Sequence, residues 1–225
     1  MKINAIITGT TGMVGKSVLL ECLESANVES VLIINRKSIN LTHPKLKEII
    51  HTDFYDLTSI KQELKDYNAC FFCLGTSAIG KNEAQYSKIT YELTSHFAST
   101  LYELNPKMVF NYVSGAGTDS SEKGKTMWAR VKGKTENMIL NKGFKDAYMF
   151  RPGIILPEKG VKSSTGWYNV FYILFKPLFP IMKFSKNITT SSKLGMAMIN
   201  SILNPQQLKH LENKDINELA IKLKN

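Results

Sequence analysis

The stretch that decides the fold is Thr8-Gly9-Thr10-Thr11-Gly12-Met13-Val14-Gly15, which stands between a β-branched run at residues 2–8 and a segment of helical apolar spacing at residues 13–25. Three glycines at intervals of three predict a tight turn that requires glycine dihedrals and lets the backbone approach a bound group closely. Free N–H groups and the dipole at the start of the following helix favour a phosphate there. The stretch predicts a nucleotide-binding strand–turn–helix unit, and the alternative is a turn with a structural role only.

The rest of the chain continues the alternation. Further strands are expected at residues 31–34, at a segment ending at 49–51, and at 70–74, 108–113 and 147–150, with helices at 57–65, 83–104 and 125–141. Strands that alternate with helices indicate parallel βαβ units, so the prediction is an α/β fold with a doubly wound parallel sheet, the Rossmann fold. Because no internal repeat or linker is visible, residues 1–225 are expected to form one domain.

Composition narrows the class of protein. Apolar residues make up 43% and charged residues 21%, which is typical of a soluble globular protein. The net charge of +10 comes from scattered basic residues, so we expect a solvated surface and no nucleic-acid partner. Three cysteines without a disulfide framework favour a reducing compartment, and no signal peptide is apparent, so a cytoplasmic protein is expected. The histidines show no ligand spacing, and no metal is expected.

Two local patterns refine this picture. Cys70 and Cys73 form a C-x-x-C pattern inside an apolar run, where residues three apart point to opposite faces of a strand, so a core role is favoured over redox chemistry. The second strand is followed by Asn35-Arg36-Lys37 and lacks the acid that NAD binders often place there. A guanidinium clamps a 2′-phosphate well, which predicts a preference for NADPH over NADH; the alternative is an ordinary surface arginine.

With these motifs placed, the chain resembles the short-chain dehydrogenase/reductase superfamily in its atypical, epimerase-like branch. The resemblance rests on "TGTTGMVG", "NRK", "TDFYD", "CLGTS", "VSGAG", "WARVKGKTE" and "RPGIILP", which span about the first 155 residues. The segment "SILNPQQLKHLENKDINEL" is similar to the Tat-interacting-protein oxidoreductase subgroup. The resemblance implies an NADP(H)-binding carbonyl oxidoreductase, with residues from about 155 to 225 on the substrate side.

The resemblance also implies roles for individual residues. The pyrophosphate would be held by Gly9, Thr10, Thr11, Gly12, Met13 and Val14, and the 2′-phosphate by Arg36 and Lys37. The adenine and its ribose would lie against Asp53, Phe54, Cys73, Leu74 and Gly75. The nicotinamide and its ribose would be bound by Lys132, Pro152, Gly153 and Ile154, and Ser114 would orient the substrate.

Trp128 departs from the family pattern, because it stands where the family has its catalytic tyrosine, four residues before Lys132. An indole N–H donates a hydrogen bond but does not titrate, so Trp128 cannot shuttle a proton. Three readings stay open. Another group donates the proton, for which Tyr112, Tyr86 and Tyr168 are candidates; or the protein is a catalytically weak NADPH sensor or scaffold; or it is a structural partner-binding domain. Trp128 itself could also be a core aromatic residue.

Residues 166–184, "GWYNVFYILFKPLFPIMKF", are the most apolar stretch, but Lys176, Pro177 and Pro180 interrupt it and argue against a transmembrane helix. As a lid, the segment would form an apolar pocket for a small-molecule substrate, expected to be an apolar carbonyl compound. As a surface anchor, its aromatic residues would enter a bilayer while its lysines meet anionic headgroups. A lid is favoured, and peripheral membrane contact stays open. The family resemblance also allows a homodimer through the long helices.

Overall fold

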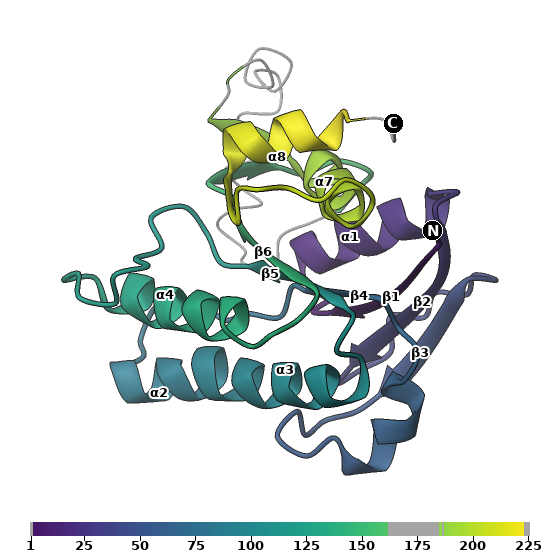
Figure 1. Ribbon diagram of the computed structural model, residues 1–225, viewed down its shortest axis with the longest axis horizontal. Helices are drawn as coiled ribbons and strands as arrows, with labels where there is room; N and C mark the ends of the chain where they lie inside the picture. The colour runs from purple at the N-terminus through teal and green to yellow at the C-terminus, as the bar shows by residue number, and fades with distance from the viewer. Residues whose placement is uncertain (1, 162–184, 186, 223–225) are drawn as a thin grey trace.

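The computed structural model describes residues 2–161, 185 and 187–222, and it is a three-layer α/β fold (Figure 1). A seven-stranded sheet has the order β3-β2-β1-β4-β5-β6-β9, and every pairing in it is parallel. Its strands are β1 (Ile3–Thr8), β2 (Val28–Asn35), β3 (Leu46–Ile50), β4 (Ala69–Phe72), β5 (Val109–Val113), β6 (Asp146–Arg151) and β9 (His210–Glu212). A separate parallel pair joins β7 (Ile154–Leu156) to β8 (Ile188–Thr190). The predicted Rossmann fold is confirmed.

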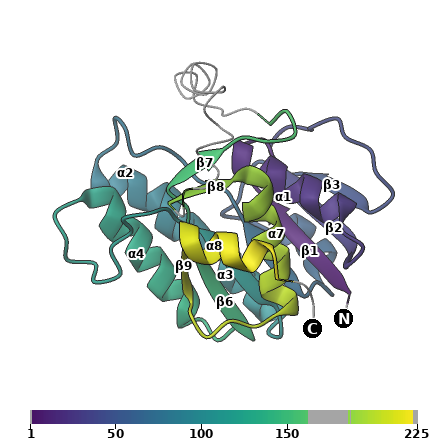
Figure 2. The same ribbon diagram turned by 90° about the horizontal axis from the view of Figure 1, so that it is seen from above.

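Helices cover both faces of the sheet (Figures 1 and 2). One face carries α1 (Met13–Glu24), α7 (Ser191–Leu203) and α8 (Asn213–Ala220). The other carries α2 (Glu83–Ser87), a π-helical turn η2 (Lys88–Glu92), α3 (Leu93–Leu104) and α4 (Met127–Leu140). Alternate residues of a strand point to opposite faces, so Ile7 enters the α1 core whereas Ile6 enters the α3 core. The sheet is therefore buried on both sides, as an all-parallel sheet requires.

Several elements differ from expectation. Residues predicted as a helix at 57–65 form a 3₁₀ helix, η1 (Thr58–Leu64), with only Ile60 and Leu64 buried. The strand predicted at 70–74 ends at Phe72, so Cys73 and Leu74 lie in the loop that follows it. The expected helix at 83–104 is present, but a π-helical turn lies inside it. Beyond Arg151 the sequence patterns assigned no elements, yet β9 completes the sheet and α7 packs against α1.

The sheet order places a site. Because all seven strands are parallel, the loops after β1, β2, β4, β5 and β6 emerge at one edge. From β1 the chain extends outward through β2 and β3 on one side and through β4, β5 and β6 on the other. The crevice at such a reversal point is where ligands bind in open α/β sheets. The predicted nucleotide motifs lie at this edge.

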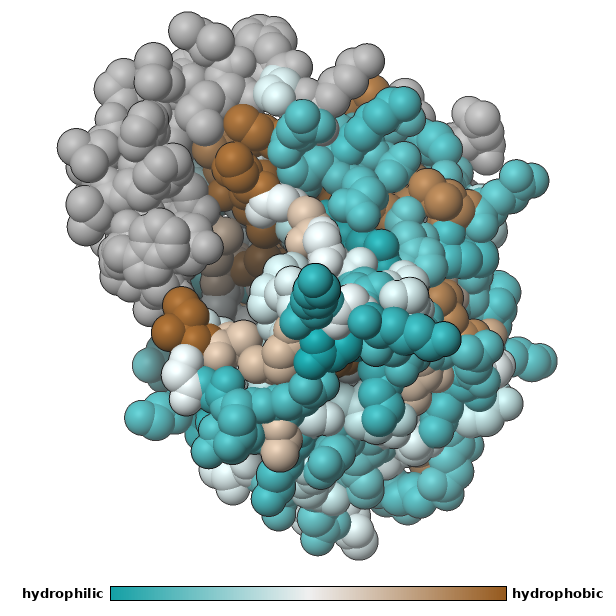
Figure 3. All heavy atoms as spheres, turned by 90° about the vertical axis from the view of Figure 1, so that its left-hand side faces the viewer, coloured by the Kyte–Doolittle hydropathy of each residue, from teal (hydrophilic) through white to brown (hydrophobic). Residues whose placement is uncertain are grey.

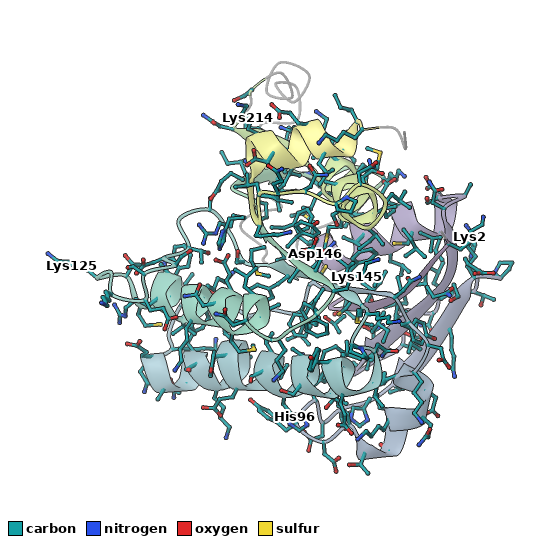
Figure 4. The ribbon with its side chains drawn as sticks, viewed as in Figure 1. Lys2, His96, Lys125, Lys145, Asp146 and Lys214 are labelled. Carbon is teal, nitrogen blue, oxygen red and sulfur yellow. The ribbon has the colours of Figure 1, made fainter. Side chains whose placement is uncertain are left out.

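Charged residues are spread over the molecule. Figure 4 shows Lys2, Lys125 and Lys214 at separate ends of the fold, in keeping with the diffuse basic charge of the sequence. Among the described residues, no helix is both long enough and apolar enough to span a membrane. The apolar segment at 166–184, including Tyr168, lies outside the described residues.

Candidate nucleotide-binding site

The glycine-rich turn joins β1 to α1 through close backbone contacts. Gly9 has a φ of +73°, and a Cβ there would lie 2.6 Å from the Cys73 carbonyl oxygen. A Cβ on Gly15 would lie 2.3 Å from the Gly9 oxygen, so the helix packs directly onto the turn. Gly12 caps α1 without a side-chain hydrogen bond, and the first turn of α1 carries no acid. The helix start therefore offers unshielded N–H groups to an anion.

A pocket of about 270 Å³ opens beside this turn. It is lined by Gly9, Thr11, Gly12, Ile34, Asn35, Arg36, Phe54, Cys73, Leu74 and Gly75. Eight of the residues singled out from the sequence are in this lining, and Ile34 and Asn35 were missed. Ile34 looks like a core residue in the sequence, and Asn35 belongs to the Asn35-Arg36-Lys37 motif but was given no role in binding. No residue of the lining is acidic.

The other residues predicted to bind the pyrophosphate, the 2′-phosphate and the adenine lie outside the pocket lining. Thr10 is fully buried and donates through Oγ1 to Asn35 Oδ1 at 2.8 Å. Met13 and Val14 are partly buried and pack against the α1 core. Lys37 is exposed on the turn after β2. Asp53 accepts a 2.9 Å hydrogen bond from the Tyr55 backbone N–H, which shapes the loop around Phe54.

Ser114 lies just after β5 and its side chain is turned toward α4. Its Oγ donates to Glu136 Oε1 at 2.5 Å, and Ser114 and Glu136 are 4% and 0% exposed. Arg151 binds both oxygens of the same carboxylate, through Nε at 3.0 Å and through Nη2. His210 Nε2 lies 3.5 Å from Glu136 Oε2, and burial lowers the pKa of His210. Glu136 thus joins the ends of β5 and β6 to α4, a role that the sequence motifs did not indicate.

Lys132 reaches the same edge from α4. Its ammonium donates to the Ser114 carbonyl, and a Cβ on Gly115 would lie 3.8 Å from Nζ. Burial lowers the pKa of Lys132 to about 8, although the Glu136 carboxylate acts in the opposite direction. Part of the Lys132 side chain stays accessible to solvent. The site therefore contains an amine whose pKa lies well below that of an ordinary lysine.

Trp128 lies one turn before Lys132 and is partly exposed. A Cβ on Gly117 would lie 3.6 Å from its Cη2 atom, so the indole packs against the loop after β5. The two described tyrosines considered as proton donors lie in the core. Tyr112 and Tyr86 are each 2% exposed, and burial raises the pKa of both. The Tyr112 ring packs 6.0 Å from the Phe72 ring, between the sheet and α3.

The turn after β6, at residues 152 and 153, lies at the same end of the sheet and is bonded to the β5 loop and to α8. The Pro152 carbonyl accepts a 3.0 Å hydrogen bond from Ala116 N, and Gly153 N donates to Asn213 Oδ1 at 3.1 Å. These bonds tie the turn to the β5 loop and to α8. Ile154 is 48% exposed, and Ile79, in the loop after β4, is 82% exposed. Figure 3 shows a mostly hydrophilic face on which the hydrophobic residues form several separate patches.

The family follows from a match that covers more than half of the chain. Residues 5–135 match the model of the NAD dependent epimerase/dehydratase family. The chain belongs to this family. The rat protein HTATIP2 is 23% identical over 221 residues, covering 96% of this chain and 89% of that protein. Protein FMP52 of Meyerozyma guilliermondii is 28% identical over 166 residues, covering 73% of this chain and 69% of that protein. The resemblance read from the sequence motifs is confirmed.

Solved structures of epimerase-like and short-chain dehydrogenase type share the fold. The Bordetella bronchiseptica enzyme WbmH in complex with NAD⁺ superposes with a TM-score of 0.67 at 15% identity, covering 93% of this chain and 74% of that one. A short chain dehydrogenase from Burkholderia cenocepacia in complex with NADP gives a TM-score of 0.64 at 11% identity, covering 93% of this chain and 86% of that one.

The expectation of a cytoplasmic protein is contradicted, because the FMP52 relatives are named as mitochondrial proteins.

Proposed function

We propose that the chain is a nicotinamide dinucleotide-binding oxidoreductase that prefers NADP(H). The observation that carries the proposal is the pocket at the reversal point of the sheet, which combines the Gly9–Gly12 turn with Arg36 and contains no acid. A phosphate anion is favoured by both features, since the start of α1 offers N–H groups and Arg36 offers paired charge-assisted donors. Membership of the epimerase family supports the same nucleotide class.

The residues fit a dinucleotide laid along the sheet edge. The pyrophosphate would lie on the glycine-rich turn, the adenosine between Phe54 and the loop at 73–75, and the 2′-phosphate beside Arg36, with Lys37 as a second cation. Lys132 would bind the ribose of the nicotinamide, which would border Pro152, Gly153 and Ile154. When bound, the nicotinamide supplies or accepts the hydride.

The chain's own residues set the proton chemistry. Trp128 does not titrate, and Tyr112 and Tyr86 are buried with raised pKa values. We assign the proton to the Lys132 ammonium, which contacts the Ser114 carbonyl and has a pKa near the range that general acids need. The exposed side chain of Ile154, at the end proposed for the nicotinamide, supports an apolar carbonyl compound as substrate.

A second function, that of a weakly catalytic NADPH sensor or scaffold, is favoured by one observation. The hydroxyl of Ser114, which would orient a substrate, is bound to the Glu136 carboxylate. NADPH oxidation followed by absorbance with a panel of aldehydes and ketones separates the two functions. Turnover that is lost in Lys132→Met supports the oxidoreductase, whereas tight NADPH binding without turnover of any panel member supports the sensor.

A further inference from the structure

Glu48 lies on the edge strand β3 and accepts hydrogen bonds from three residues at the end of β2 and in the turn that follows it. Its Oε1 accepts hydrogen bonds from Asn35 Nδ2 at 2.9 Å and from the Ile39 backbone N–H at 3.1 Å. Its Oε2 accepts from Ser38 Oγ at 2.5 Å. Burial opposes ionisation, but these hydrogen bonds hold the pKa of Glu48 below its ordinary value. One carboxylate thus closes the turn that carries Arg36.

The same network reaches the glycine-rich turn. Thr10 Oγ1 donates to Asn35 Oδ1 at 2.8 Å, while Asn35 Nδ2 donates to Glu48. Thr10 and Asn35 are 0% and 3% exposed, so the bond between them is shielded from water, whereas Glu48 is partly exposed. The chain Thr10–Asn35–Glu48 therefore connects the turn proposed for the pyrophosphate with the turn proposed for the 2′-phosphate.

The network also explains why β2 ends in asparagine. An aspartate at position 35 would have no proton to donate to Glu48, and it would place a second carboxylate 2.9 Å from the first. Two carboxylates at that separation do not both ionise readily. The acid that NAD binders often carry at this point is incompatible with the Glu48 contact.

Glu48 acts on the turn and not on the ligand. Arg36 and Asn35 line the pocket, whereas Glu48 does not. A carboxylate beside a phosphate would repel it, but this one is occupied by three donors of the protein. Its contacts hold residues 35, 38 and 39 on both sides of Arg36. The backbone that carries the Arg36 side chain is therefore restrained.

We propose that Glu48 is a positioning residue for nucleotide selectivity, which holds residues 35–39 so that Arg36 is presented to a 2′-phosphate. The inference rests on the proposed nucleotide site and names a determinant of its selectivity. Its loss would lower the affinity for the 2′-phosphate more than that for the 5′-phosphate, because the glycine-rich turn is also held by its close contacts with Cys73 and with Gly15 of α1.

The test uses calorimetric titration of the full chain with adenosine 2′,5′-bisphosphate and with adenosine 5′-monophosphate, which differ only in the 2′-phosphate. Glu48→Ala removes the contacts, and the ratio of the two affinities is expected to fall about tenfold or more, the scale of one lost charge-assisted contact. Glu48→Gln keeps an oxygen for Asn35 and Ile39 and an amide beside Ser38, so its ratio should stay within about threefold of wild type. Glu29→Ala, at the opposite end of β2, removes the same charge and should leave the ratio unchanged.

Each other result has one meaning. An unchanged ratio in Glu48→Ala overturns the inference while the nucleotide site stands. Tighter bisphosphate binding in both Glu48 variants shows that the carboxylate only repels phosphate, and also overturns it. Wild-type protein that binds neither compound, or binds both equally, overturns the proposed NADP(H) preference and this inference with it. Should Glu48→Ala fail to fold by circular dichroism, Ser38→Ala on the exposed turn decides: a ratio lowered about two- to threefold supports the inference, and an unchanged one contradicts it.

Discussion

Ser114 Oγ and Glu136 Oε1 are joined by a 2.5 Å hydrogen bond in a part of the molecule that excludes water. The serine follows β5 and the glutamate lies on α4, one turn after Lys132. Arg151, at the end of β6, binds the same carboxylate. A single buried acid therefore fixes the relative positions of the β5 loop, the β6 turn and the helix that carries Trp128 and Lys132.

Replacing this acid should destabilise the fold. Glu136→Gln leaves the Arg151 guanidinium, whose side chain is only 12% exposed, without its buried partner. Breaking a buried ion pair from one side costs about 3 kcal/mol or more, so urea unfolding should show a loss of this size. Glu212→Gln is the matched control, because this half-exposed acid lies 3.7 Å from Arg151 and should change stability by less than about 1 kcal/mol. Equal losses in the two variants would show that Glu136 has no special role.

Trp128→Tyr should raise the turnover of carbonyl compounds. The change places a titratable phenol one turn before Lys132, whose cation lowers the pKa of a nearby tyrosine. General acid catalysis contributes about 10²-fold or more, so NADPH oxidation should increase by at least about tenfold over a low wild-type rate. Trp128→Phe, which replaces the indole by a phenyl ring without a hydroxyl, should give no increase. If both variants respond alike, the space vacated by the indole and not the hydroxyl is responsible.

Lys132 should make the nucleotide-free protein more stable as the pH rises from about 8 to about 10. The folded protein releases this proton near pH 8, whereas the unfolded chain keeps it up to about pH 10.4. The unfolded state therefore binds more protons in this window, and stability increases with pH across it. The free energy of unfolding of wild type relative to Lys132→Met should rise by on the order of 1 kcal/mol. Parallel curves for the two proteins would show that the lysine pKa is not lowered.

Gly15 and Gly12 of the turn should differ in their effects: replacing Gly15 should lower stability, and replacing Gly12 should weaken nucleotide binding. Gly15→Ala forces a methyl group against the Gly9 carbonyl, and overpacking of this kind costs about 1–3 kcal/mol. A Cβ on Gly12 would only touch the same oxygen at 3.4 Å, so Gly12→Ala should keep most of the stability. Because Gly12 lines the pocket, that variant should instead weaken nucleotide binding. Thermal unfolding and calorimetry measure the two effects; a Gly15→Ala protein as stable as wild type would contradict the close packing.

The sequence predicted the binding residues that follow directly after a strand, and the strands that form short apolar runs. The glycine-rich turn, Arg36 and the loop at 73–75 meet in one pocket because each follows a strand of the same parallel sheet. Apolar runs located β1, β2, β4, β5 and β6, since a strand buried on both faces forms a short apolar run. Only the end of β3 was placed, because this edge strand has no buried residue. Cys70 lies in the core on the α3 side, and Cys73, in the loop after β4, packs against the core on the α1 side.

Long-range polar contacts were not visible in the sequence. Glu48 and Glu136 look like ordinary charged residues, and only the folded chain brings them to Asn35 and Ser114. The three-residue strand β9 gives too short a pattern to recognise, although it completes the sheet. Cellular location was also mispredicted, because cysteine usage and the absence of an apparent signal peptide do not distinguish the cytoplasm from other reducing compartments.

We propose above all a nucleotide site whose preference for NADP(H) is set by Arg36. Calorimetric titration of wild type, Arg36→Ala and Lys47→Ala with NADPH and NADH tests it most directly, with the exposed Lys47 on β3 as the control for loss of one positive charge. We expect wild type to bind NADPH more tightly than NADH. Arg36→Ala should lose about ten- to a hundredfold in NADPH affinity and keep its NADH affinity, since charge-assisted bonds to a phosphate contribute about 1.5–3 kcal/mol. Lys47→Ala should behave as wild type. Equal wild-type affinities for NADPH and NADH would contradict the claim.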